Sequence, residues 1–187
     1  MGILSIGMSR TWSAWQGGRL RAALYARPRI TALVFLAAIL SLIFLGPWHL
    51  AVMQHESVHF KFAVWRAVGK SYQPAAGEYV MFIFSGDDPN GMGLKKGYSL
   101  TKRVGCTAGQ VISVSDDGRF YCNGQYLGAA LSRSPASKKN LVRAAFDGSP
   151  IPEGKVFMIG DIPTSYDSRY WGLADVNDIY GVVSLRI

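Results

Sequence analysis

The chain has 187 residues, a length that allows one domain with a sizeable core and a short appendage. Hydrophobic residues make up 49% of it, and its formal net charge is +8. Five arginines and no acidic residue lie in residues 1–29, and the remaining 15 Lys and Arg against 12 Asp and Glu leave +3 for the rest. This distribution argues against a nucleic-acid-binding protein, whose cations are spread over a folded face.

An apolar segment follows the arginine-rich leader. Residues 30–46, ITALVFLAAILSLIFLG, carry no charge, and the segment extended to residue 52 has the roughly 20 residues that a bilayer core requires. Arginines mark the cytoplasmic side of such a segment. We therefore expect a basic cytoplasmic segment at 1–29, one transmembrane anchor at 30–52 and an exported domain at 53–187. A cleaved signal peptide is the alternative, although the leader is long and no Ala-x-Ala site follows.

The exported part is predicted to be mostly β. Two alternating runs between residues 110 and 128 flank Asp116-Asp117-Gly118, which predicts a hairpin. Residues 85–97 are rich in Gly, Pro and Asp and predict a loop, and residues 128–150 have no clear period and predict an extended excursion. Further apolar or alternating runs predict strands at 58–65, 77–84, 155–161 and 179–187.

The residues HESVH at 55–59 match the H-E-x-x-H pattern of zinc proteases. That pattern needs a helix, where the two histidines share one face. On a strand, positions 55 and 59 lie roughly 13 Å apart, too far for one zinc ion with ligands at about 2.0 Å. The third histidine, His49, falls at the predicted membrane edge. A zinc metalloprotease that depends on Glu56 is a lesser alternative. In the leading interpretation neither a metal nor another cofactor is expected.

Two cysteines, Cys106 and Cys122, flank the predicted hairpin. In an oxidising exported compartment a disulfide across the hairpin is geometrically reasonable. Two reduced, buried cysteines are the alternative, because Cys packs well as a small hydrophobic residue.

Two later stretches are more specific. The stretch TKRVGCTAGQVI (101–112) contains Lys102-Arg103-Val104, and GDIPTSYDSRYWG (160–172) is a dense run of polar groups between predicted strands. Together they resemble the lysine box and the D-S-R box of the signal peptidase I family of membrane-bound serine peptidases. The second box is matched at Gly160, Asp161, Ser165, Asp167, Ser168, Arg169 and Gly172. Within the family the chain is similar to the short, singly anchored conjugative-transfer signal peptidases of the TraF type.

The resemblance implies a signal-peptidase-like β catalytic domain after one transmembrane helix, with a Ser/Lys dyad. Ser57, just beyond the apolar segment, corresponds to the nucleophile and Lys102 to the general base. A lysine serves as a base only when its pKa of about 10.4 is lowered, and burial does this. Ser165 is expected to orient the lysine. Three further residues are expected to form one buried charged network: Asp161, Asp167 and Arg169.

The resemblance also implies the partners and the location. The substrate is expected to be a membrane-inserted pre-protein, a pilin precursor, which is cleaved or cyclised beside the lipid bilayer. The chain is expected in the bacterial inner membrane, with its N-terminus cytoplasmic and its catalytic domain periplasmic. At the nucleophile it has Ser57-Val58-His59-Phe60, where the family usually has Ser-Met-x-Pro or Ser-Leu-Pro. A non-catalytic assembly component of a conjugative transfer system is therefore the main alternative.

Overall fold

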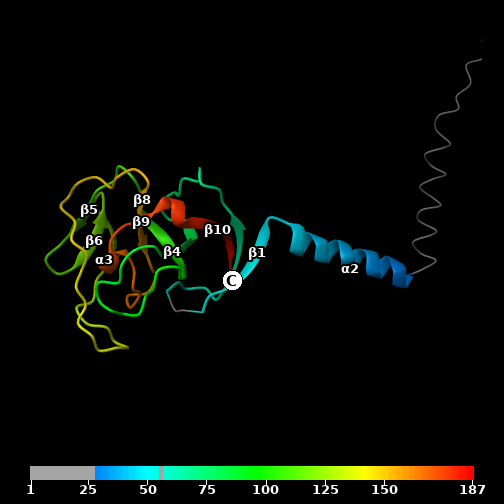
Figure 1. Cartoon of the computed structure of the whole chain (residues 1–187), viewed down its shortest axis with the longest axis horizontal. Helices are drawn as coiled ribbons and strands as arrows, with labels where there is room; N and C mark the ends of the chain where they lie inside the picture. Colours follow the sequence, from blue (N-terminus) through cyan, green and yellow to red (C-terminus); the bar gives the residue numbers. More distant parts are fainter. Residues whose placement is uncertain (1–27, 55–56) are drawn as a thin grey trace, which may run out of the picture. The chain divides into compact units, whose positions relative to one another are not determined.

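The structure, a computed structural model, describes residues 28–54 and 57–187. The chain divides into two compact units, Met1–Gly46 and Pro47–Ile187. Helix α2 (Pro28–Leu45) belongs to the first unit, whereas the strands, helix α3 (Ser168–Trp171) and the 3₁₀ helix η1 (Val176–Asp178) belong to the second (Figure 1). The strands are β1 (Trp48–Val52), β2 (Phe62–Ala67), β3 (Tyr79–Ile83), β4 (Ser99–Cys106), β5 (Ile112–Val114), β6 (Arg119–Cys122), β7 (Gln125–Ala129), β8 (Lys155–Ile159), β9 (Ala174–Asp175) and β10 (Ile179–Arg186). The prediction of a mostly β body is confirmed.

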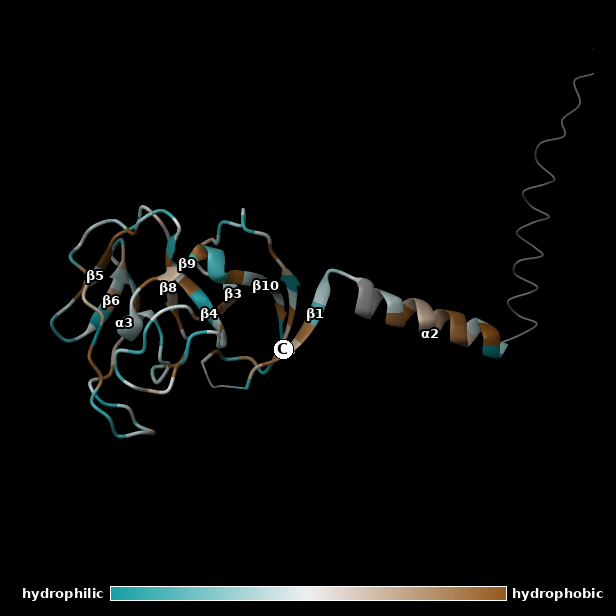
Figure 2. Ribbon diagram, viewed as in Figure 1, coloured by the Kyte–Doolittle hydropathy of each residue, from teal (hydrophilic) through white to brown (hydrophobic). Residues whose placement is uncertain are grey.

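Helix α2 carries no charged residue after Arg29, and Figure 2 shows brown along much of it beyond the teal first residues. It begins at Pro28, because proline suits the first turn of a helix, and it ends before Gly46-Pro47, where proline can neither donate a hydrogen bond nor follow a helical residue easily. The predicted anchor ran to residue 52, but the helical part stops at Leu45 and Trp48–Val52 form strand β1 instead. Among the described residues, no helix combines the length and the apolarity needed to cross a membrane.

The second unit contains two antiparallel sheets. The larger has the strand order β1-β2-β10-β3-β4-β8-β9, and the smaller has the order β5-β6-β7. The main core packs around Val80, Val104 and Met158 from the three strands β3, β4 and β8. Strand β4 is therefore central to the larger sheet, and any polar side chain on its covered face is buried.

Several strand predictions differ in detail from the structure. The strands expected at 77–84, 155–161 and 179–187 appear as β3, β8 and β10. The strand expected at 58–65 begins only at Phe62. Residues 57–59 form a turn, and Val58 in the turn and Phe60 just after it are buried. Apolar alternation at 58–60 thus comes from a turn whose apolar side chains pack inward, and not from a pleated strand.

The predicted hairpin around residues 116–118 is present as β5 and β6, but a third strand follows. The second turn is Asn123-Gly124, with φ values of 47° and 81°. Asn-Gly is a strong signal for this left-handed turn, and the sequence interpretation overlooked it. The excursion expected at 128–150 begins two residues later, because residues 128 and 129 belong to β7. Residues 130–150 contain no named strand and are held by single bridges such as Arg133 to Asn140.

A disulfide joins Cys106, the last residue of β4, to Cys122, the last residue of β6. Their Cα atoms are 5.7 Å apart, and both residues are buried in a core shared with Phe120 and Phe157. The bond therefore connects the larger sheet to the smaller sheet directly, four residues after Lys102.

Candidate active site

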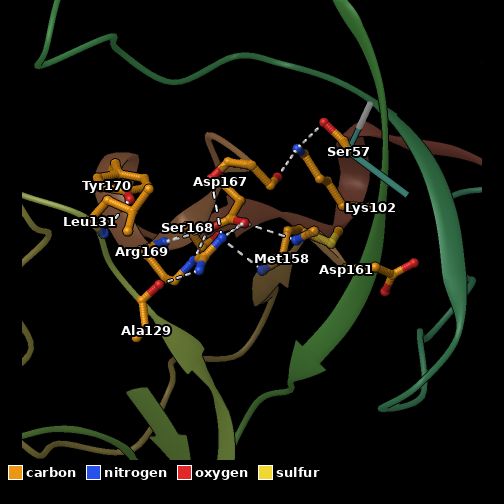
Figure 3. A network of polar contacts seen from close by, with 12 residues as sticks. Ser57, Lys102, Ala129, Leu131, Met158, Asp161, Asp167, Ser168, Arg169 and Tyr170 are labelled. Atoms are coloured by element: carbon orange, nitrogen blue, oxygen red, sulfur yellow. Dashed lines mark hydrogen bonds and ion pairs between the residues drawn. The ribbon is translucent and has the colours of Figure 1, made fainter. Parts of the chain in front are cut away.

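The strand β4 carries Lys102 into the interior of the body. Lys102 is 2% exposed and lies opposite Val80 of β3. Its amine donates to Ser57 Oγ at 2.8 Å and to Ser165 Oγ at 2.7 Å (Figure 3). Ser57 and Ser165, which are 45 and 63 positions from Lys102 in the sequence, thus contact the same nitrogen atom. Strand β4 fixes the direction in which the Lys102 side chain leaves the backbone, because successive side chains of a pleated strand point to opposite faces.

Burial lowers the pKa of Lys102 to about 8. The nearby carboxylate of Asp167 opposes this shift, the charge of Arg169 adds to it, and the carboxylate of Asp161 opposes it again. Burial outweighs the two carboxylates because the charged amine loses its hydration, and among the residues that the structure describes none forms an ion pair in direct contact with it. A large share of the amines is therefore uncharged near pH 8, and an uncharged amine can accept the proton of a serine hydroxyl.

Ser57 sits in the turn 57–59, which packs against the loop 160–165. The backbone N–H of Asp161 donates to the carbonyl of Ser57 at 2.8 Å. Gly160 makes this approach possible: a Cβ there would lie 2.0 Å from Ser165 Oγ and 2.8 Å from the Ser57 carbonyl oxygen. Any side chain at position 160 would therefore push apart the two serines that Lys102 contacts.

Behind the lysine lies a buried ion pair between Asp167 and Arg169. The guanidinium makes two bonds to the carboxylate, from Nε to Oδ1 at 2.8 Å and from Nη2 to Oδ2 at 2.7 Å. The same carboxylate accepts the N–H of Gly160 at 2.9 Å, and Arg169 Nη2 donates to the carbonyl of Ser165 at 3.1 Å. Hydrogen bonding to Asp167 keeps the pKa of Arg169 raised despite its burial. The pair thus holds both ends of the loop that carries Ser165.

Asp161 does not join this pair, which differs from the single charged network expected from the sequence. It lies apart from Asp167 and Arg169 (Figure 3). Its carboxylate accepts bonds from the Tyr79 hydroxyl at 2.8 Å, from Arg103 Nε at 3.3 Å and from the backbone N–H of His59 at 3.2 Å. The loop turns between positions 161 and 167. The Asp161 carboxylate therefore contacts the turn of Ser57, whereas the Asp167 carboxylate contacts Arg169 and Gly160.

A groove of about 620 Å³ is lined by Ser57 and Lys102. Residues 51–54, Ser57 and Val58 line one side, and residues 97–102 with Met81 line the other. The residues at the end of β1 and the start of β4 form most of its walls, so backbone is present on both sides. An extended peptide with small or apolar side chains suits such a groove.

Other sequence candidates have less support. His55 and Glu56 of the H-E-x-x-H pattern lie outside the described residues, and His59 is exposed. Within residues 28–54 and 57–187 no group of three His, Cys, Asp or Glu side chains could hold a metal ion. The sequence interpretation missed Tyr79 entirely. Arg103 was visible in the Lys-Arg-Val motif, but nothing indicated that Asp161 is its partner.

Comparisons with known proteins identify a family. The family model described as "Signal peptidase, peptidase S26" matches residues 25–187. No curated protein matches the chain. Among solved structures, the crystal structure of a signal peptidase I from Enterococcus faecalis V583 is similar, with 24% sequence identity and a TM-score of 0.39. That similarity covers 60% of this chain and 98% of the other.

Proposed function

The chain belongs to the signal peptidase family, peptidase S26, and from this premise we propose that it is a membrane-anchored peptidase with Ser57 as nucleophile and Lys102 as general base. The family makes the chain a serine endopeptidase that processes exported proteins. The observation that carries the residue assignment is the hydrogen bond of 2.8 Å between the buried Lys102 amine and Ser57 Oγ.

The proposed reaction starts with an uncharged Lys102. Its nitrogen takes the proton of Ser57 Oγ while that oxygen attacks the carbonyl carbon of the scissile peptide bond. The backbone N–H of Ser57 donates to the resulting oxyanion. Lys102 then gives the proton to the leaving amine, and the C–N bond breaks, which leaves an acyl group on Ser57. Water, deprotonated by Lys102, releases the acyl group and restores the free serine.

Ser165 completes the environment of the base. An uncharged primary amine has two hydrogens and one lone pair, and Ser165 Oγ accepts one of the hydrogens at 2.7 Å. This bond leaves the lone pair free to point toward Ser57. We therefore assign Ser165 the role of orienting Lys102, and we assign Asp167 and Arg169 the role of holding the loop that carries Ser165.

The proposal places the body on the outer face of the bacterial inner membrane. The arginine-rich leader and the apolar segment that starts in α2 support an anchor with a cytoplasmic N-terminus. Within the second unit, strands β1, β2 and β10 also expose large apolar side chains, at Leu50, Val52, Phe62 and Leu185. Val52 pairs with Phe62, and Leu50 and Leu185 both pair with Val64, so the four lie close together on these strands. A lipid surface would cover such side chains at low cost.

Intact spheroplasts that express the full chain test the activity and the location together. The substrate is an internally quenched, membrane-impermeant peptide with an Ala-x-Ala site, the type of site found in exported precursors. We expect intact spheroplasts to cleave the peptide added outside them. The supernatant left after the spheroplasts are removed should not cleave it, and neither should spheroplasts that express Ser57→Ala. Cleavage only after lysis would reverse the orientation, and equal cleavage by Ser57→Ala would exclude Ser57 as the nucleophile.

The clients that the sequence resemblance implies are pilin precursors. Co-expression of a candidate precursor with the same two variants, read by mass spectrometry, separates three outcomes. A shortened, linear product indicates that water released the acyl group. A product one water lighter than that linear fragment indicates that an amine of the same fragment released it and closed a ring. Activity of the transfer system that persists with Ser57→Ala would favour the non-catalytic assembly component.

A further inference from the structure

We propose that Tyr79 is a positioning residue for the reaction, because it holds the carboxylate of Asp161 against the turn that carries Ser57. This inference rests on the proposed function, since it assigns a role toward the proposed nucleophile. Tyr79 does not face the groove and touches neither Ser57 Oγ nor Lys102 in any described bond. It acts through Asp161.

Asp161 makes two hydrogen bonds to the backbone of the turn that carries Ser57. Its backbone N–H donates to the Ser57 carbonyl at 2.8 Å, and its Oδ2 accepts the N–H of His59 at 3.2 Å. One residue thus holds the backbone on both sides of Val58. These two bonds fix where Ser57 leaves the turn, and therefore the direction of its hydroxyl toward Lys102. No proline stiffens residues 58–60, and a proline at position 59 would lack the N–H that Asp161 uses.

The carboxylate itself is held mainly by Tyr79. The Tyr79 hydroxyl lies 2.8 Å from both carboxylate oxygens, whereas Arg103 reaches one of them at 3.3 Å with a side chain that is 30% exposed. The register of β3 and β4 pairs Tyr79 with Arg103, so both side chains leave the sheet on one face and converge on Asp161. Burial and the neighbouring carboxylate raise the pKa of Tyr79, which keeps its hydroxyl protonated and able to donate.

The ring of Tyr79 makes a second contact with the same turn. It packs edge-to-face on Phe60 with centroids 5.1 Å apart, and the guanidinium of Arg186 lies over it at 4.8 Å. Phe60 is held there in a small core with Val58 and Ala63. Removing only the hydroxyl therefore tests the hydrogen bond while the packing of the turn is preserved.

The test compares Tyr79→Phe with the wild type, as full chains in detergent, using the quenched Ala-x-Ala peptide. A displaced nucleophile lowers the rate rather than the affinity, so we expect kcat to fall between about 10- and 100-fold while KM stays within about twofold of the wild type. The matched control is Tyr72→Phe, which removes a tyrosine bond of 2.5 Å to Glu78 outside the site. We expect wild-type kcat for that control.

Two further measurements separate positioning from general damage. In Tyr79→Phe the amide of His59 should exchange with deuterium faster than in the wild type and in Tyr72→Phe. Adding Tyr79→Phe to Asp161→Asn should lower kcat no further than Asp161→Asn alone, because both act on one contact. Wild-type kcat in Tyr79→Phe, or an equal loss in Tyr72→Phe, would overturn the inference and leave the proposed function intact. Failure of the wild type to cleave the peptide would instead contradict the proposed function.

Discussion

Replacing Lys102 by methionine should lower kcat by a factor of about 10² to 10⁴, the contribution expected of a general base. Methionine fills a similar volume among the same buried neighbours but cannot accept the proton of Ser57. Removing the nucleophile as well should cost little more, because a nucleophile and its base act as one unit. The measurement is kcat on the quenched peptide for Lys102→Met, for Ser57→Ala and for the double variant.

Lys102→Met should lower activity but raise the stability of the fold, because it removes a buried amine. The folded pKa of Lys102, about 8, lies below the pKa of an unfolded lysine, near 10.4. The wild type therefore bears the full cost of burying this group below pH 8, and it recovers stability as the pH rises from 8 toward 10.4. Relative to Lys102→Met, the wild type should gain in Tm over that interval.

The matched control is Lys155→Met, which removes another strand lysine, paired with Asp175 at 3.2 Å and 43% exposed. Its kcat should equal that of the wild type, and its free energy of unfolding should change by less than about 1 kcal/mol. A Lys102→Met variant that retains more than a tenth of the wild-type kcat would remove Lys102 from the role of base.

Replacing Asp167 by alanine should be the most destabilising single change in the site. Both Asp167 and Arg169 are almost fully buried, so the variant leaves an uncompensated guanidinium in the core. Loss of one partner of such a pair costs about 3–5 kcal/mol. The N–H of Gly160 also loses its acceptor, so the loop that brings Ser165 to Lys102 is released. Urea denaturation of the full chain in detergent gives the free energy of unfolding.

A surface ion pair provides the comparison. Asp117 is paired with Arg119 at 3.0 Å, with both side chains more than half exposed. Asp117→Ala should lower the free energy of unfolding far less than Asp167→Ala does, because solvent screens an exposed pair. If the Asp167→Ala and Asp117→Ala variants have the same unfolding free energy, the buried pair does not hold the loop as described above.

Apolar runs and two-residue alternation in the sequence predicted most strands of the larger sheet, but not where those strands begin and end. The apolar runs that became β3 and β8 are interior strands with nearly continuous burial, which dictates their composition. The run that became β10 is also an interior strand, but only its first half is buried. Strand β1 was assigned to the anchor because an exposed, apolar edge strand and a membrane segment have the same composition. The position of Gly46-Pro47 was the available signal for the end of the helix.

The site shows the same division between local and long-range information. The D-S-R motif located Ser165, Asp167 and Arg169 because these residues are local to one loop and its short helix. No spacing rule could show that Asp161 turns away from Asp167, since that depends on the register that brings Tyr79 and Arg103 together across β3 and β4. Contacts set by strand pairing therefore appeared only in the folded chain.

The most direct measurement of the role of Lys102 is the dependence of kcat on pH for the wild-type chain with the quenched peptide. Because only the uncharged amine accepts the proton of Ser57, kcat should be highest above the lysine pKa of about 8. It should fall about tenfold for each pH unit below that value, to roughly 1% at pH 6. A kcat that stays constant from pH 9 to pH 5, in a chain that remains folded, would contradict an uncharged Lys102 as the base that activates Ser57.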